Sequence, residues 1–457
     1  MRNTILMGAA ALIAAGSGTS VAGQSPAPRE PSRFWTQLGD PTLTRLVGEA
    51  VRNGTTVQIA EARLDEARSS RRASMFDLVP TVTANGSALR TRESMAQVPG
   101  LTSPLPQRDL YDFGFDASWE LDVFGRVRHS ISAQTALASS AEYSVEDVQV
   151  SLSAEVGSSY FELRGAQRQL AVATSNADVQ RKTVALTEDR LAAGRGTAFD
   201  VERARTILQL TLAAVPSLEA HVAASRYRLA ALLGRSPGAD VPEVVEGGPF
   251  PSFPDSVTIG AMQQVVRSRP DVLAAERQVA AQRSAVAAAQ ADYMPRVSLA
   301  ASTGYTADRL QSLTQTGTSR LVVGPVVSFP LLDLGRVRQR VGMAQGVADE
   351  AQARYTAAVL QATEEAQVAV VSYDRSRARV LLLEEAVKSS ARASVLAQQR
   401  FEAGLTDFIQ VLDAQRTALE AENQLAEAQT NASMALVRVY KAVGGRWDLP
   451  ATAQRAP

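Results

Sequence analysis

Apolar residues recur along the chain with two different periods, and each period predicts one kind of element. From Arg126 to Leu191, apolar positions lie three, four or seven residues apart and no proline interrupts them, which is typical of an α-helix. From Tyr111 to Asp122, apolar and polar residues alternate over twelve positions, which indicates a β-strand with one apolar and one polar face. The chain therefore combines very long helices with a few strands.

The chain also repeats itself. The run Gly-Arg-Val-Arg at 125–128 recurs at 335–338, a shift of 210 residues. The same shift brings Arg190 and Gly194 onto Arg400 and Gly404. Coincidences at a single offset indicate two copies of one unit. We expect a first structural repeat over 23–240 and a second over 241–457.

Each repeat is expected to hold a strand pair followed by two long helices. The expected strands span about 80–90, 111–122, 296–306 and 319–329, and the expected helices about 126–191, 198–233, 336–403 and 406–443. At ~1.5 Å per residue, the first long helix would reach about 100 Å. Pro216 inside the second helix predicts a kink or a local break.

The four strands are long enough to cross a membrane, since about ten residues suffice for a tilted strand. Four strands cannot close a barrel of useful bore. They therefore form an open sheet or are completed by other chains.

The N-terminus resembles an export signal. Arg2 precedes an apolar stretch of about ten residues, and small residues follow up to Ala22, which predicts a cleaved signal peptide over 1–22. The apolar stretch is too short to span a membrane, which takes about twenty residues. The mature chain is thus either soluble in the periplasm or inserted in a membrane through its strands.

Composition removes several classes of function. Lys and Arg together number 47, as do Asp and Glu, so no net charge favours a nucleic-acid partner. The chain has no Cys, which excludes disulfides, thiolate metal sites and Cys-linked lipid anchors. The two histidines, His129 and His221, have no histidine partner nearby in the sequence. With no phosphate loop, nucleophile elbow or zinc-ligand spacing, we expect no enzyme, no cofactor and no metal site.

Four motifs carry a resemblance to a known family. They are Ser-Trp-Glu-Leu-Asp-Val-Phe-Gly-Arg-Val at 118–127, Phe-Pro-Leu-Leu-Asp-Leu-Gly-Arg at 329–336, Arg-Phe-x-Ala-Gly at 400–404 and Val-Leu-Asp-Ala-Gln-Arg at 411–416. Asp-Pro-x-Leu at 40–43 and Tyr-Lys-Ala-x-Gly-Gly at 440–445 extend the likeness to both ends. In this set the chain resembles the outer-membrane efflux proteins of the OprM/NodT type, which are related to TolC.

The resemblance implies an α+β membrane protein that works as a homotrimer. Each chain would give four strands to a twelve-stranded outer-membrane β-barrel, which continues into a periplasmic α-helical barrel. Such a trimer is the exit duct of a tripartite efflux pump, and its partners are a periplasmic adaptor, an inner-membrane RND-type transporter and outer-membrane lipid. The same duct could instead serve a type I protein secretion system. A secreted coiled-coil scaffold is the alternative from another class, which the duplicated strand pairs disfavour.

One departure from the family concerns membrane attachment. Many members of this branch carry a lipid-modified Cys directly after the signal, and this chain has no Cys. Attachment would then depend on the barrel alone.

The resemblance also implies a gate at the periplasmic end of the tunnel. Asp413 would form a ring of three carboxylates, and Ile409, one turn earlier, an apolar constriction. The alternative for Asp413 is a solvated carboxylate that pairs with Arg416. Asp200 occupies the equivalent position of the first repeat, where TolC-like proteins use an acid to tie the helix pairs together through a Tyr and an Arg.

The partners of that tie are altered in this chain. The corresponding positions hold Phe401 and Thr406, so a latch on Asp200 would need Arg195, Arg203 or another arginine.

Two further groups of residues are assigned by place. The turns at the helix tips would contact the adaptor; they contain Gly194, Arg195, Gly404 and Leu405. The acids that alternate with aromatic residues on the strand at 111–122 would face the barrel lumen; they are Asp112, Asp116 and Glu120. The aromatic residues between them would face lipid; they are Tyr111, Phe113, Phe115 and Trp119.

Overall fold

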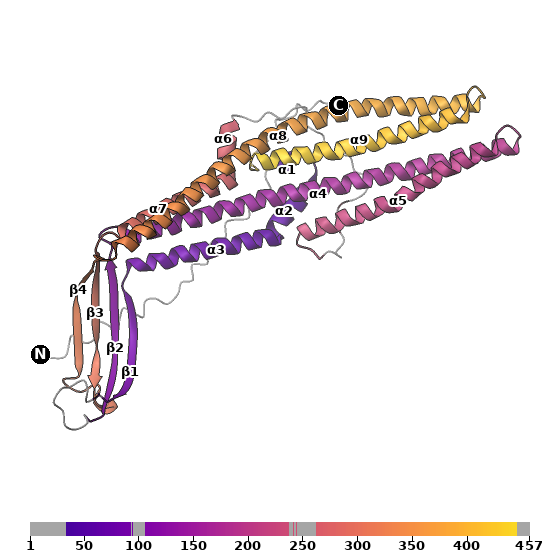
Figure 1. Ribbon diagram of the computed structural model, residues 1–457. Coiled ribbons are helices and arrows are strands. Elements are labelled where there is room, and N and C mark those ends of the chain that lie inside the picture. Colours follow the sequence, from indigo (N-terminus) through magenta and orange to yellow (C-terminus); the bar gives the residue numbers. More distant parts are fainter. Residues whose placement is uncertain are drawn as a thin grey trace.

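The computed structural model describes residues 33–92, 94, 106–236, 241, 244 and 262–445. The expected signal peptide at 1–22 lies outside the described residues. The molecule is strongly elongated, with a small sheet at one end and the tips of two helical hairpins at the other (Figure 1).

The two halves of the chain share the order of their main elements: short helices, a strand pair and two long helices. The first half contains α1 (Arg33–Gln37), α2 (Pro41–Asn53), α3 (Thr55–Met75), a 3-10 turn η1 (Phe76–Leu78), β1 (Thr81–Thr91), β2 (Arg108–Leu121), α4 (Arg126–Ala192) and α5 (Ala198–Leu232). The second contains α6 (Met262–Arg267), α7 (Pro270–Ala291), β3 (Arg296–Ala307), a 3-10 turn η3 (Leu310–Ser312), β4 (Ser319–Ser328), α8 (Leu334–Glu402) and α9 (Phe408–Ala442). In each half a strand pair leads into a long hairpin of two helices.

Most element ends lie within three residues of the expected positions, and Pro216 is the clear exception. Of the two alternatives, the local break is wrong, because α5 is one helix across Pro216, and the kink stays a prediction. Pro216 is exposed, so water can hydrate the carbonyl group that loses its helical N–H partner.

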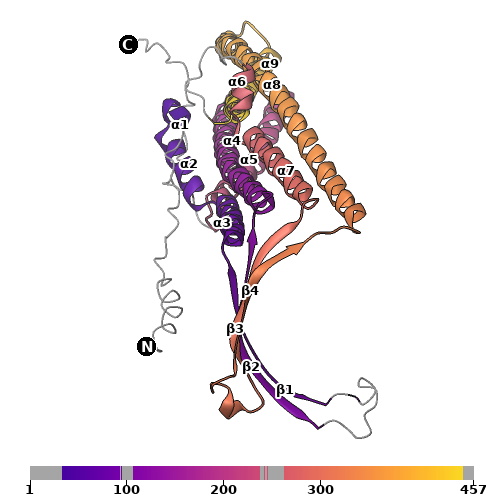
Figure 2. The ribbon, with the colours of Figure 1, turned by 90° about the vertical axis from the view of Figure 1, so that its left-hand side faces the viewer.

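The four strands form one antiparallel sheet in the order β1-β2-β3-β4. Asp112 of β2 lies opposite Ser87 of β1 and opposite Thr306 of β3. Since paired residues point to the same face, the polar positions of all three strands share one face of the sheet. β1 and β4 each have one unpaired edge, and the sheet twists strongly along its length (Figure 2).

The long helices pack along one another over much of their length. α4 contacts α3, α5, α7 and α9, while α8 contacts α7 and α9. Gly165 of α4 marks a close approach to α9, because a Cβ added there would lie 2.2 Å from the Thr430 hydroxyl oxygen. α4 has 67 residues and α8 has 69, so each is about 100 Å long.

Both ends of the described chain meet at the middle of the rod. The rings of Phe34 and Trp35 lie 4.7 and 4.9 Å from that of Tyr440. The Tyr160 hydroxyl donates a 2.6 Å hydrogen bond to Asp40, which also caps the start of α2. Burial, followed by this contact, raises the pKa of Tyr160. The motifs at 40–43 and 440–445 therefore belong to one structure, which we call the belt.

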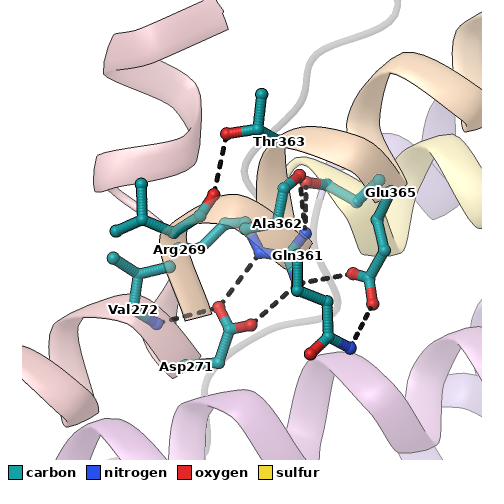
Figure 3. A network of polar contacts seen from close by, with 9 residues as sticks. Arg269, Asp271, Val272, Gln361, Ala362, Thr363 and Glu365 are labelled. Carbon is teal, nitrogen blue, oxygen red and sulfur yellow. Dashed lines mark hydrogen bonds and ion pairs between the residues drawn. The ribbon is translucent and has the colours of Figure 1, made fainter. Parts of the chain in front are cut away.

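Arg269 ties α7 and α8 to the end of α9 in the belt, and Figure 3 shows its contacts with Asp271 and Glu365. This arginine is 5% exposed, and its Nη2 donates to Asp271 at 2.7 Å and to Glu365 of α8 at 2.8 Å. Its Nη1 donates to the Ala442 carbonyl at the end of α9, at 3.1 Å. A buried cation with this many acceptors holds three helices in one arrangement, because loss of any acceptor would leave it undercompensated.

Asp147 on α4 lies close to this network. Burial, and then the neighbouring carboxylate of Asp271, raise the pKa of Asp147. Asp147 therefore places a carboxyl group that is harder to ionise than usual close to Arg269.

Candidate functional site

The predicted tip residues lie at two turns with the same backbone path. Gly194 and Gly404 have φ angles of +69° and +75°. The N–H groups of Arg195 and Leu405 each donate a 2.8 Å bond to the carbonyl five residues earlier. This is the glycine-ended helix stop that the sequence spacing predicted. All four of these tip residues are exposed.

The helices that follow the two turns start differently. Thr197 and Asp200 form a reciprocal cap at the start of α5: the Asp200 N–H donates to the Thr197 hydroxyl at 3.1 Å, and the Thr197 N–H donates to the Asp200 carboxylate at 3.3 Å. At the start of α9, Asp407 occupies the cap position without a side-chain bond. The Thr406 hydroxyl instead donates to Gln410.

Asp200 thus has partners within its own turn. The Thr197 hydroxyl also donates to its carboxylate, at 2.6 Å. In the single chain the carboxylate therefore serves the start of α5, and a latch to Arg195 or Arg203 stays a prediction.

Phe401 lies between the two hairpins near their tips. Its side chain is 8% exposed and packs in a cluster with Phe408, whose ring centre is 5.3 Å away. The remaining buried members of this cluster are Ala204, Val411 and Leu412. Phe401 therefore fills an apolar core. It has no hydroxyl group with which to make the hydrogen bond that the tyrosine of TolC-like proteins would make at this position.

Arg190 of α4 ties the hairpins together, a role that no motif in the sequence predicted. Its Nη1 donates to the Phe401 carbonyl at 2.8 Å, and its guanidinium lies 4.2 Å from the centre of the Phe401 ring. A cation above an aromatic ring adds attraction to the hydrogen bond. The signal was present in the sequence, because Arg190 is one of the residues that coincide in the two repeats.

The predicted gate residues share one exposed face of α9. Ile409, Asp413 and Arg416 are four and three residues apart, which places them on one side of the helix. Arg416 Nη2 donates to Asp413 at 3.1 Å, and these side chains are 73% and 67% exposed. Ile409 is 51% exposed. The structure brings Asp413 and Arg416 together in the single chain, while the carboxylate ring stays a prediction.

A cavity of about 660 Å³ continues from Arg416 along the hairpins. It lies over α4 between α5 and α9, and its lining includes Gln180, Ile207 and Leu419. The surface next to the predicted gate is therefore hollowed and mostly apolar.

The three predicted lumen acids each have a hydrogen-bond partner: Asp112 and Asp116 within the sheet, and Glu120 at the start of α4. Asp112 accepts a 2.9 Å bond from Arg320 and a 2.7 Å bond from the Thr306 hydroxyl. Asp116 accepts from the amide of Asn85. Glu120 accepts two bonds from Arg126, at 2.9 and 2.7 Å.

The junction between β2 and α4 is held by charged groups. The hydrogen bond that Arg126 donates to Glu120 raises the pKa of Arg126. Burial would raise the pKa of Asp122, but the N–H groups of Arg128 and Val127 hydrogen-bond its carboxylate and hold that pKa below its usual range. The motif at 118–127 thus fixes how the helix leaves the sheet.

Other chemistry has little support in the part of the chain that the structure describes. No group of three or more His, Asp or Glu side chains there could hold a metal ion. By length and hydropathy alone, α5 is long and apolar enough to cross a membrane. Only 6% of its most apolar window is buried in the single chain, so most of that apolar surface is exposed. It pairs with α4 in the first hairpin.

Both halves of the chain match one known protein family. The sequence pattern of the family described as "outer membrane efflux protein" matches residues 46–235 and 261–445. The chain belongs to the outer membrane efflux protein family. The two matched segments follow the two halves of the chain, so the family pattern itself reflects the duplication.

Individual members of the outer membrane efflux family resemble the chain over most of its length. Nodulation protein T of Rhizobium leguminosarum bv. trifolii is 29% identical over 396 residues, which cover 86% of this chain and 84% of that protein. The toluene efflux pump outer membrane protein TtgI of Pseudomonas putida is 28% identical over 414 residues, covering 90% and 86%. The solved outer-membrane channel OprN superposes with a TM-score of 0.85 at 37% identity, over 92% of this chain and 94% of that one.

These findings confirm the predicted family and fold class. The chain has the fold of the outer membrane efflux channels, with a β domain and a periplasmic helical barrel. It is an outer-membrane transport protein with a large periplasmic portion. Its family and structural neighbours are channels and not enzymes.

Proposed function

We propose that three copies of this chain form the exit duct of a tripartite efflux pump for drugs or other small toxic compounds. The duct receives its cargo from a periplasmic adaptor and an inner-membrane RND-type transporter. The observation that carries the proposal is the join between an open four-stranded sheet and two helical hairpins, each with a helix of about 100 Å. A toluene efflux pump protein among the relatives supports the class of cargo.

The unpaired edges of the sheet support a trimer. Every residue of β1 is exposed, and β4 has a free edge on the other side. Lipid cannot satisfy the backbone groups of such edges. Pairing of β4 with β1 of the next copy removes both edges, and three copies give twelve strands.

Exposed apolar residues on the hairpins support the same assembly. They lie on α5 and on α8, at opposite sides of the single chain, and include Phe199, Leu210, Leu381, Leu382 and Leu396. A ring of copies would bring α5 of one chain against α8 of the next and bury these side chains. This accounts for the high hydropathy of α5 without a membrane around it.

The apolar face of the sheet fits contact with lipid. Phe113 and Phe115 are 47% and 43% exposed, and Leu321 of β4 on the same face is 74% exposed. The opposite face carries the hydrogen-bonded acids and would line the lumen.

The gate follows from the same assembly. Convergence of three α9 helices would bring three Asp413 carboxylates together beside three Ile409 side chains, which favours a bound cation and excludes water. Adaptor contact at Gly194, Arg195, Gly404 and Leu405 would then separate the tips.

The test is complementation in a host strain that lacks its own outer-membrane efflux channel and retains a cognate adaptor and RND-type transporter. Full-length protein is expected to raise the minimal inhibitory concentrations of dyes and solvents, and to migrate as a trimer in mild detergent. A monodisperse monomer would contradict the assembly. Restored export of a protein substrate, without any change in drug tolerance, would favour a type I secretion duct.

A further inference from the structure

The polar face of the sheet contains an arginine that reaches across a neighbouring strand. Arg320 starts on β4, opposite Gly304 of β3, which in turn lies opposite Gly114 of β2. Its guanidinium binds Asp112 on β2 through Nη2 at 2.9 Å and Nε at 3.2 Å, and Nη1 donates to Ser302. The charge of the second repeat thereby meets an acid of the first.

The two glycines make this reach possible. A Cβ at Gly114 would lie 2.5 Å from the Thr303 carbonyl oxygen and 3.2 Å from Arg320 Nη2. A Cβ at Gly304 would lie 2.5 Å from the Phe113 carbonyl oxygen. Both glycines let the β2 and β3 backbones approach closely, and a side chain at Gly114 would in addition crowd the Arg320 guanidinium.

Arg320 changes the net charge of the part of the polar face that holds Asp112 and Asp116, which we call the acidic level. Asp112 and Asp116 contribute two negative charges per chain, and Arg320 supplies the positive charge bound to Asp112. Asp116 accepts from the neutral amide of Asn85. The level therefore carries one net negative charge per chain with Arg320, and two without it.

We propose that Arg320 sets the ion selectivity of the barrel because its positive charge neutralises the negative charge of Asp112. The inference rests on the proposed trimer with the polar face inward. There the level carries three net negative charges with Arg320 and six without it. Rings of uncompensated carboxylates favour cations and repel anions. Arg320 thus keeps the duct more passable for anionic cargo than two bare rings of acids, at Asp112 and Asp116, would leave it.

The experiment compares ion selectivity in planar bilayers, using purified full-length trimers under a tenfold KCl gradient. Low ionic strength is chosen because salt screens these charges over ~10 Å at 0.1 M. Arg320→Gln is expected to raise the potassium-to-chloride permeability ratio by roughly twofold or more. Arg320→Gln with Asp112→Asn restores the charge of the level and is expected to return the ratio to the wild-type value, as is the conservative variant Arg320→Lys.

Arg90→Gln is the matched control. Arg90 forms an equivalent pair with Asp109, with Nε–Oδ1 at 2.6 Å and Nη2–Oδ2 at 2.9 Å, but on the opposite face of the sheet. Its loss changes the net charge of the chain equally and is expected to leave the permeability ratio unchanged.

The outcomes separate this inference from the proposed function. An unchanged ratio in conducting Arg320→Gln trimers would overturn the role of Arg320 while leaving the duct intact. A raised ratio that the double variant fails to restore would also overturn it, since the effect would then come from shape. Absence of trimers and of channels in the wild-type protein would contradict the proposed function itself.

Discussion

The tips of the α4–α5 and α8–α9 hairpins follow the same backbone path and are stabilised differently. Each helix stops at a glycine with positive φ, and each turn closes with a 2.8 Å backbone bond. α5 then starts with the reciprocal Thr197–Asp200 cap, whereas the cap position of α9 makes no side-chain bond. Duplication has kept the turn and changed the start of the helix after it.

From this difference we expect the start of α9 to open more easily than the start of α5. The first N–H groups of a helix need partners, and those of α9 depend on water where those of α5 have a side chain. The less stabilised start belongs to the helix that carries Ile409, Asp413 and Arg416. A rigid first hairpin beside a second one that opens more easily suits a gate whose movable residues lie on α9.

Removing the core shared by the two tips is expected to have the largest effect. Phe401→Ala should lower the free energy of unfolding by about 3 kcal/mol, because it leaves a cavity between Phe408 and Arg190. Thermal unfolding of the detergent-solubilised trimer measures the loss. Phe401→Tyr is the conservative variant for comparison, since it keeps the ring and adds only a hydroxyl group. Full stability of Phe401→Ala would show that the hairpins are not joined at this point.

The shared turn is tested next. Gly194→Ala and Gly404→Ala should each lower stability by roughly 1–2 kcal/mol, because a side chain strains a backbone with positive φ. No atom lies within 4 Å of a Cβ at either position, so the two losses should be equal. Unequal shifts in unfolding temperature would mean that the turns differ more than their φ angles indicate.

The differing caps predict a smaller and unequal effect. Thr197→Ala should lower stability by about 1 kcal/mol, because it removes the side-chain acceptor for the Asp200 N–H. Asp407→Ala, at the equivalent position of α9, should leave the unfolding temperature within error. Hydrogen exchange at the first turns of α5 and α9 provides a second readout. Equal protection of the two turns would contradict the comparison.

Asp413→Ala is expected to have the smallest effect on stability, since it removes only an exposed ion pair. Its effect should appear in conductance: the isolated trimer should conduct more and lose its block by divalent cations. Asp65→Ala is the control, because Asp65 lies on α3, far from the tips. Unchanged conductance and block in assembled Asp413→Ala trimers would identify Asp413 as an ordinary partner of Arg416.

Sequence periodicity could predict the elements because each one depends on neighbours in the chain. The alternation at 111–122 and the proline-free run after Arg126 correspond to β2 and α4. Phe401 could be flagged from its motif, and Arg190 from its coincidence with Arg400.

The contacts of Arg320 and Arg269 could not be predicted in this way. Arg320 reaches Asp112 only because the register places Gly304 and Gly114 between them. Arg269 is a single arginine before a proline in the sequence, and its acceptors lie on α8 and at the end of α9. Both contacts depend on which distant segments become neighbours in the fold, and the local sequence pattern does not predict this.

The belt has a consequence for the order in which the chain folds. Phe34 and Trp35 near the start of the described chain pack against Tyr440 near its end, so this core closes a loop of almost the whole polypeptide. A contact with so large a sequence separation forms late, because its loop-closure entropy must be offset by contacts made earlier. The hairpins, whose partners are adjacent in sequence, can form while the belt is still open. Until the last turn of α9 is in place, the aromatic pair at the start lacks the Tyr440 side of its core, and incompletely buried apolar surface of this kind is prone to aggregation.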